Sequence, residues 1–70
     1  ERKMITLKQV REGSIVKVRG GFGSESAKRA TVTCVESDIK NGYPGIDYTV
    51  IATGDEHWAY LDQVVEVEQF

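Results

Sequence analysis

The sequence predicts a small all-β domain built from five short strands. Apolar and polar residues alternate with a period of two along most of the chain, and a helical period is nearly absent. β-Branched and aromatic residues dominate the alternating segments. Glycine-rich and polar turn signals separate these segments. We expect strands over residues 14–19, 30–36, 46–52, 57–61 and 64–70.

The alternation also predicts which side chains form the core. The residues expected to face inward are Val16, Val18, Ala30, Val32, Cys34, Ile46, Tyr48, Val50, Val65 and Val67. The fourth segment, "HWAYL", is ambiguous, because either Trp58 and Tyr60 or Ala59 and Leu61 could face the core.

The connections between the strands differ in length. Residues 20–28 and 37–45 are expected to be long loops, the second containing Asn-Gly and Pro-Gly turn signals. Residues 53–56 are short enough for a hairpin, and residues 61–64 indicate a 3₁₀-like turn. Before the first strand, residues 6–13 predict one helical turn that begins with Thr6 as N-cap and ends at Gly13.

This order of strands and loops resembles the SH3-like small barrel shared by Tudor, KOW and related domains, over about residues 5–68. "TLKQVREGSIVKV" is similar to the opening of such barrels, and "YLDQVVEV" to the link into their last strand. The resemblance implies one five-stranded barrel domain over residues 4–70, in which the first and last strands pair. Met4 looks like a natural start, so we interpret residues 1–3 as an expression remnant.

The resemblance also implies a non-catalytic binding module whose ligand groove is framed by the two long loops. Many Tudor domains carry a Tyr-Gly-Asn-like run after the matching Asp-Tyr, and here Asp47-Tyr48 is followed by Thr49-Val50. This departure argues against the reading of methylated side chains.

The charge of the chain is unevenly distributed. Residues 4–30 hold six basic and two acidic residues, a net +4, whereas residues 31–70 hold one basic and eight acidic residues, a net −7. The asymmetry indicates either a basic binding face or internal pairing of the two halves. If the first and last strands pair, Lys17 and Arg19 are expected near Glu66 and Glu68.

The stretch "VRGGFGSESAKRA", residues 18–30, invites functional interpretations that its context contradicts. It lacks the Gly-Lys-Ser/Thr ending of a phosphate-binding loop and the third glycine of a dinucleotide fingerprint. A single Arg-Gly-Gly copy and a GxxG without flanking helices are also uninformative. We interpret it as a mobile loop that presents Phe22 to solvent.

The expected binding face lies on the loops at 20–29 and 37–45 together with Trp58. Its candidate residues are Arg19, Phe22, Lys28, Arg29, Tyr43 and Trp58. A protein partner is the first prediction, because the chain is acidic overall and Phe22 is expected to be exposed. The alternative is RNA or DNA, bound by the three basic residues and by base stacking on the aromatic rings. A short barrel of this kind also suits small accessory proteins, including those of viruses and mobile elements, by analogy.

The sequence predicts no enzyme, cofactor or metal centre. Cys34 is the single cysteine and His57 the single histidine, so no intramolecular disulfide and no paired zinc-ligand spacing exist. No apolar run could span a membrane and no leader pattern is visible, so we expect a cytoplasmic protein.

Overall fold

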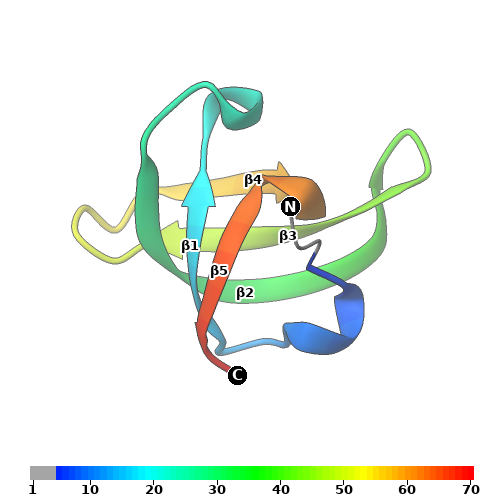
Figure 1. Ribbon diagram of the computed structural model, residues 1–70, viewed down its shortest axis with the longest axis horizontal. Coiled ribbons are helices and arrows are strands. Elements are labelled where there is room, and N and C mark those ends of the chain that lie inside the picture. The colour runs from blue at the N-terminus through cyan, green and yellow to red at the C-terminus, as the bar shows by residue number, and fades with distance from the viewer. Residues whose placement is uncertain (1–4) are drawn as a thin grey trace.

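The computed structural model describes residues 5–70, and this part of the chain is all-β, as predicted (Figure 1). The interpretation of residues 1–3 lies outside the described residues. The elements in chain order are η1 (Leu7–Gln9), β1 (Ile15–Arg19), η2 (Gly21–Gly23), β2 (Ala27–Lys40), β3 (Tyr43–Val50), β4 (Glu56–Tyr60), η3 (Leu61–Gln63) and β5 (Val64–Gln69). The three η elements are single 3₁₀ turns, two of which the sequence predicted.

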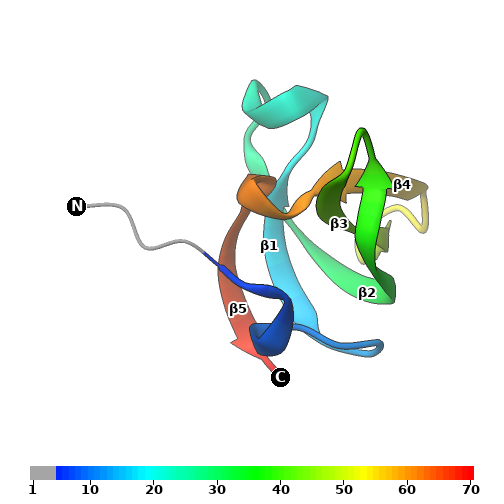
Figure 2. The same cartoon turned by 90° about the vertical axis from the view of Figure 1, so that its right-hand side faces the viewer.

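The five strands form one antiparallel sheet in the order β4-β3-β2-β1-β5. The pairing of the first and last strands is therefore confirmed. The sheet bends so that β1 and β5 cross over β3 and β4 (Figures 1 and 2). Among residues 5–70 no ladder joins β4 to β5, so the sheet is open at this point.

Strand β2 makes the bend possible because it belongs to both halves of the sheet. It is 14 residues long, and it pairs with β1 over 27–31 and with β3 over 30–40. The prediction of a long loop at 37–45 is wrong. Both strands continue through that segment to a tight turn at Asn41 and Gly42, whose φ angles are 56° and 78°. An Asn-Gly pair at positive φ is the preferred turn of a two-residue hairpin.

The core lies between the two crossing halves of the sheet and largely matches the predicted alternation. The buried hydrophobic residues are Val10, Val16, Val18, Ala30, Val32, Ile46, Tyr48, Val50, Ala59, Leu61 and Val64. The ambiguity in β4 is resolved, because Ala59 and Leu61 face the core. Trp58 and Tyr60 therefore lie on the outer face of the sheet.

Two residues predicted to face the core are exposed because the ladders are irregular. The β2–β3 register shifts between Val32 and Cys34, so Cys34 turns to the surface. The β1–β5 register shifts between Lys17 and Val18, so Val64 replaces Val65 in the core and Val65 is 45% exposed. A bulge moves every later side chain of a strand to the opposite face, which a period-two pattern cannot foresee.

Part of the charge asymmetry is internal pairing. Lys17 Nζ lies 3.7 Å from Glu66 and 3.9 Å from Glu68, and Arg29 Nε lies 3.1 Å from Glu68. Arg29 thus takes the place expected for Arg19, which lies at the end of β1 and pairs with Ala27. From residue 5 onward, no helix has the length and apolar character needed to cross a bilayer.

Candidate functional site

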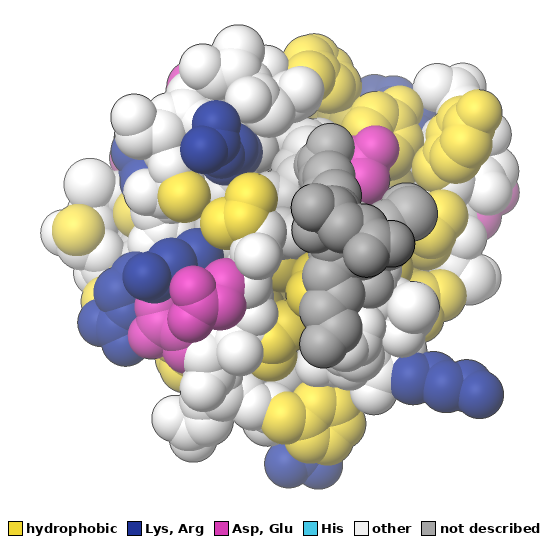
Figure 3. Space-filling view, viewed as in Figure 1, with side chains coloured by type: hydrophobic (Ala, Val, Ile, Leu, Met, Phe, Trp, Pro, Cys, Tyr) yellow, Lys and Arg dark blue, Asp and Glu magenta, His cyan; other side chains and the backbone are white. Residues whose placement is uncertain are grey.

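Four aromatic side chains from three separate elements meet on one surface, which we call the aromatic cluster. Phe22 comes from η2, Tyr43 from the start of β3, and Trp58 and Tyr60 from β4. Trp58 and Tyr60 are centred 5.2 Å apart, Phe22 lies 6.1 and 6.2 Å from these two rings, and Tyr43 lies 5.9 Å from Tyr60. Hydrophobic side chains gather on one side of the molecule over the β2–β3 hairpin and the end of β4 (Figure 3).

Phe22 owes its position to the glycines beside it. Gly21, Phe22 and Gly23 all have positive φ, at 58°, 57° and 94°. A phenylalanine in this left-handed region costs roughly 1–2 kcal/mol. Hydrogen bonds to the Gly20 carbonyl from Gly23 N (3.0 Å) and Glu25 N (3.2 Å) close the turn. The expected loop is therefore a hydrogen-bonded turn, and Phe22 is 75% exposed, as predicted.

The β2–β3 hairpin supplies the other end of the cluster. Gly42 N donates a hydrogen bond to Asp38 Oδ1 at 2.9 Å, and Asn41 Nδ2 donates one to the Tyr60 hydroxyl at 3.3 Å. The first bond closes the turn of the hairpin, and the second joins the hairpin to β4. The Lys40 ammonium lies 4.9 Å from the centre of the Trp58 ring, within cation–π range.

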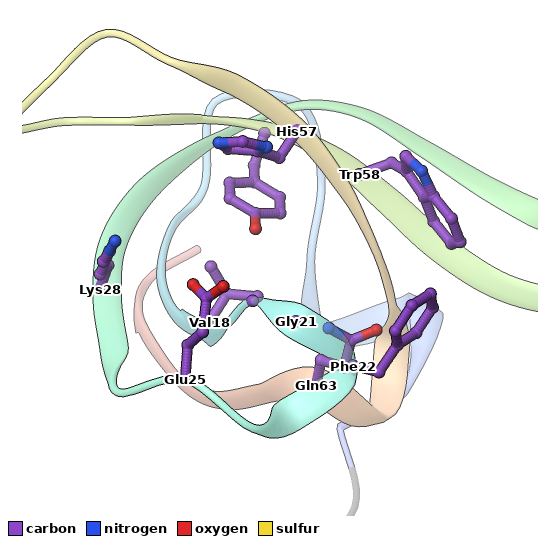
Figure 4. Close-up of a pocket in the computed structure, with 10 residues that line it drawn as sticks. Val18, Gly21, Phe22, Glu25, Lys28, His57, Trp58 and Gln63 are labelled. Carbon is purple, nitrogen blue, oxygen red and sulfur yellow. The ribbon is translucent and has the colours of Figure 1, made fainter.

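A pocket of about 230 Å³ lies beneath the η2 turn, and we call it the first-turn pocket. Its lining residues are Val18, Gly20, Gly21, Phe22, Glu25, Lys28, Tyr48, His57, Trp58 and Gln63. Figure 4 shows Glu25 entering from the turn and His57 from the opposite strand, with Phe22 and Trp58 to one side.

Tyr48 also lines this pocket, and it is 4% exposed, as the alternation predicted. Its ring contacts the His57 ring at 5.8 Å. Burial, and secondly the charge of Glu25, raise the pKa of the Tyr48 hydroxyl above its usual value. The hydroxyl therefore stays protonated at neutral pH and can both donate and accept a hydrogen bond.

Gln63 connects the pocket wall to the strands on either side. Its Nε2 donates to the Arg19 carbonyl at 2.7 Å, and its Oε1 accepts from Tyr60 N at 3.0 Å. Gln63 is buried, and both polar ends of its amide form hydrogen bonds with backbone groups, as buried polar groups normally do.

The structure brings together only some of the residues predicted for the binding face. Phe22, Tyr43 and Trp58 share the aromatic cluster, and Lys28 lines the first-turn pocket. Arg19 does not line the first-turn pocket, but it shares a neighbouring hollow with Phe22. Arg29 is bound to Glu68 on the β5 side of the molecule.

Sequence reasoning missed Tyr60, Lys40 and Glu25 as members of the site. Tyr60 could have been found, because it shares a strand face with Trp58 once Ala59 is placed in the core. Lys40 and Glu25 gave no such signal, because their positions depend on the hairpin and the turn.

A second group of polar side chains lies on the outer face of β2 and β3. The sulfur of Cys34 and carboxylate oxygens of Glu36 and Asp47 lie within 4.8 Å of one another. Three donors are one fewer than a closed structural zinc site uses. His57 borders the same shallow hollow as Cys34, but no hydrogen bond joins the two in the described part of the chain. The predicted lack of catalysis stays a prediction.

No protein-family model matches the chain, and neither a curated protein nor a solved structure was found to be similar to it.

Proposed function

We propose that this chain is a non-catalytic interaction module of the SH3-like barrel type, which binds an extended segment of a protein partner across the aromatic cluster. The observation that carries the proposal is the convergence of four rings from η2, β3 and β4 on one exposed surface. The bent sheet, the β1–β5 pair and the 3₁₀ turn before the last strand support the assignment to that fold type.

The exposure of these rings favours a binding role. Phe22 is 75% and Tyr43 62% exposed, although burial of an aromatic side chain stabilises a protein by roughly 1.5–3 kcal/mol. The left-handed backbone of Phe22 adds a further local cost. Strain and exposed aromatic surface in the same place are typical of recognition sites.

The distribution of charge favours a protein over a nucleic acid. The three basic residues predicted for phosphate contact do not converge, and Arg29 is paired with Glu68. Carboxylates of Glu25 and Asp62 line the hollows beside Phe22. A nucleic-acid interface usually shows a continuous basic surface, which this mixture of charges does not provide.

One observation favours the competing function. Lys40 lies over Trp58, so a cation and a stacking surface occur together, as in proteins that bind single strands. This alternative predicts binding that weakens steeply as salt increases.

The experiment that tests the proposal is a selection of random linear peptides on the immobilised protein. Peptides selected on the wild type should lose binding about tenfold or more with Tyr43→Ser, because an aromatic anchor of an interface contributes about 2 kcal/mol or more. Ile51→Ser is the matched control, since Ile51 is 46% exposed and lies on the β3–β4 turn, outside the aromatic cluster.

The result against the proposal is equally defined. If selection yields no peptide that distinguishes Tyr43→Ser from Ile51→Ser, the aromatic cluster is not a peptide site. Parallel titrations with labelled single-stranded oligonucleotides at two salt concentrations test the alternative. Salt-sensitive binding that is lost with Lys40→Met would replace the peptide function by nucleic-acid binding.

A further inference from the structure

The first-turn pocket contains two oxygen groups without protein partners. The Tyr48 hydroxyl makes no hydrogen bond to another residue from 5 to 70, and its oxygen reaches the solvent of the pocket although the residue as a whole is 4% exposed. The Glu25 carboxylate likewise forms no ion pair within that range. Glu25 is an exposed residue, so both oxygen groups are accessible from solvent and free to accept hydrogen bonds from a ligand in the pocket.

Gly20 and Gly21 leave room for the Glu25 side chain because they have no Cβ atoms. A Cβ atom at Gly20 would lie 2.9 Å from Glu25 Oε1 and 3.7 Å from the Tyr48 hydroxyl oxygen. A Cβ atom at Gly21 would lie 3.1 Å from Glu25 Oε2. The carboxylate therefore packs over bare backbone and points into the pocket, as Figure 4 shows. Both oxygen groups lie near the same point, beside Gly20.

We propose that the first-turn pocket binds the primary ammonium group of a lysine side chain from the partner segment. The ammonium would donate to the Glu25 carboxylate and to the Tyr48 hydroxyl oxygen, while its methylene stem lies along Phe22 and Trp58. This inference rests on the proposed function and names the anchor residue of that partner.

The size and chemistry of the pocket both select this group. Its volume of about 230 Å³ is smaller than that of most small-molecule sites, which begin near 300 Å³, so one side chain fills it. An ammonium carries three N–H donors, and two acceptor groups await them. Methylation would remove those donors, so an unmodified lysine is preferred over a trimethylated one.

Lys28 makes the sign of the charge testable. It lines the same pocket and forms no ion pair in the described part of the chain. Its charge repels a bound ammonium and attracts a bound anion. Removal of this charge therefore strengthens binding of a cation and weakens binding of an anion, which no change to the fold alone would imitate.

The experiment titrates the full, isotope-labelled chain with small probes at constant ionic strength, followed by the backbone amide signals of Gly20, Gly21 and Glu25. The probes are n-butylammonium, n-butyltrimethylammonium and butyrate. n-Butylammonium should bind saturably in the millimolar range and about fivefold more tightly than its trimethylated form, because only the former donates hydrogen bonds.

Three variants complete the design. Glu25→Gln should weaken n-butylammonium binding about tenfold, the effect of losing one charge-assisted hydrogen bond. Lys28→Met should strengthen it about twofold, as expected for removal of one exposed like charge. Glu12→Gln, which removes the same charge from the turn before β1, should leave it unchanged.

Two outcomes would overturn the inference. One is the absence of saturable signal shifts with n-butylammonium. The same conclusion follows if Glu25→Gln and Glu12→Gln both leave its binding unchanged. The other is stronger binding of butyrate that Lys28→Met abolishes, which would assign the pocket to an anion. Failure of the peptide selection with intact n-butylammonium binding would reject the proposed function alone, and the reverse result would reject only the lysine pocket.

Discussion

The two sides of the bent sheet differ in whether their surface side chains find partners within the chain. On the β1–β5 side, Lys17 and Arg29 are matched by Glu66 and Glu68, so charges meet charges within the chain. On the β4 side, the rings of the aromatic cluster cover one another only in part, and Phe22 and Tyr43 remain exposed to water. Figure 3 shows paired positive and negative groups on one flank and hydrophobic groups on the other.

This difference shows that charge asymmetry along a sequence is a poor guide to a binding surface. The basic first half of the chain is matched in part by the acidic last strand, because antiparallel pairing places the two side by side. The unmatched groups are aromatic and come from segments far apart in sequence. We call the β1–β5 side, where the charges pair, the paired side, and the β4 side with the aromatic cluster the open side. Four substitutions and one control test this difference.

The largest effect on stability is expected for Gly45→Ala, which would displace β4, the strand that carries Trp58 and Tyr60. Gly45 is paired with Tyr60, and a Cβ atom there would collide with the Ala59 carbonyl oxygen and the Ile39 side chain. Strand β4 would have to move, at a cost of about 3 kcal/mol of unfolding free energy. Denaturant titration measures this loss, and a stability equal to the wild type would contradict the observed packing.

Gly54→Ala is the control for that substitution. Gly54 has φ of 78° and open space around its Cα, so alanine there costs only backbone strain of about 1 kcal/mol.

A smaller loss is expected for Gln63→Leu, which cuts the connection between the two sides. The Arg19 carbonyl and the Tyr60 N–H would lose their hydrogen bonds in a buried site. We expect destabilisation by about 2 kcal/mol. Amide hydrogen exchange should show faster exchange at Tyr60, whereas an unchanged rate would mean that the glutamine is not the partner of this amide.

On the paired side, Glu68→Gln should have a much smaller effect, although it disrupts contacts with both Lys17 and Arg29. The two cations are 43% and 59% exposed, so solvent screens their attraction. The expected cost is about 0.5 kcal/mol at low salt, with little of it left in concentrated salt. A salt-independent loss of 2 kcal/mol or more would show that these pairs are structural.

The smallest effect on stability is expected for Phe22→Asn on the open side. Asparagine tolerates the left-handed backbone better than phenylalanine, and this gain offsets the lost ring contacts. The free energy of unfolding, measured by thermal denaturation, should therefore change by no more than about 0.5 kcal/mol. Peptides selected on the wild type should nevertheless bind about tenfold more weakly, and retained binding would remove Phe22 from the site.

Period-two alternation was sufficient to predict most of the core. Val16, Val18, Ile46 and Tyr48 are buried because their strands are regular and one face of each is covered. Cys34 and Val65 broke the pattern because each follows a register shift. Such shifts depend on how two strands pair, so the sequence of either strand alone does not predict them.

The candidate site was predicted as separate residues rather than as an assembled surface. Phe22 was recognisable as an exposed ring between glycines, and Tyr43 and Trp58 as aromatic residues near turns. Their meeting with Tyr60 depends on the bend of the sheet, which comes from the long shared strand β2. The charge pairing was predicted only in part. The β1–β5 ladder ends at Val18 and Val64, so Arg19 lies beyond it, and Arg29 rather than Arg19 pairs with Glu68.

The position of Trp58 gives the molecule a built-in optical reporter. It is the single tryptophan of the chain, and it lies between Phe22, Tyr60 and Lys40 rather than in the core. Any occupant that covers these rings removes water from the indole and moves its fluorescence to shorter wavelengths. Changes confined to the β1–β5 side leave that emission unaltered, so unlabelled protein can report occupancy of the open side by itself.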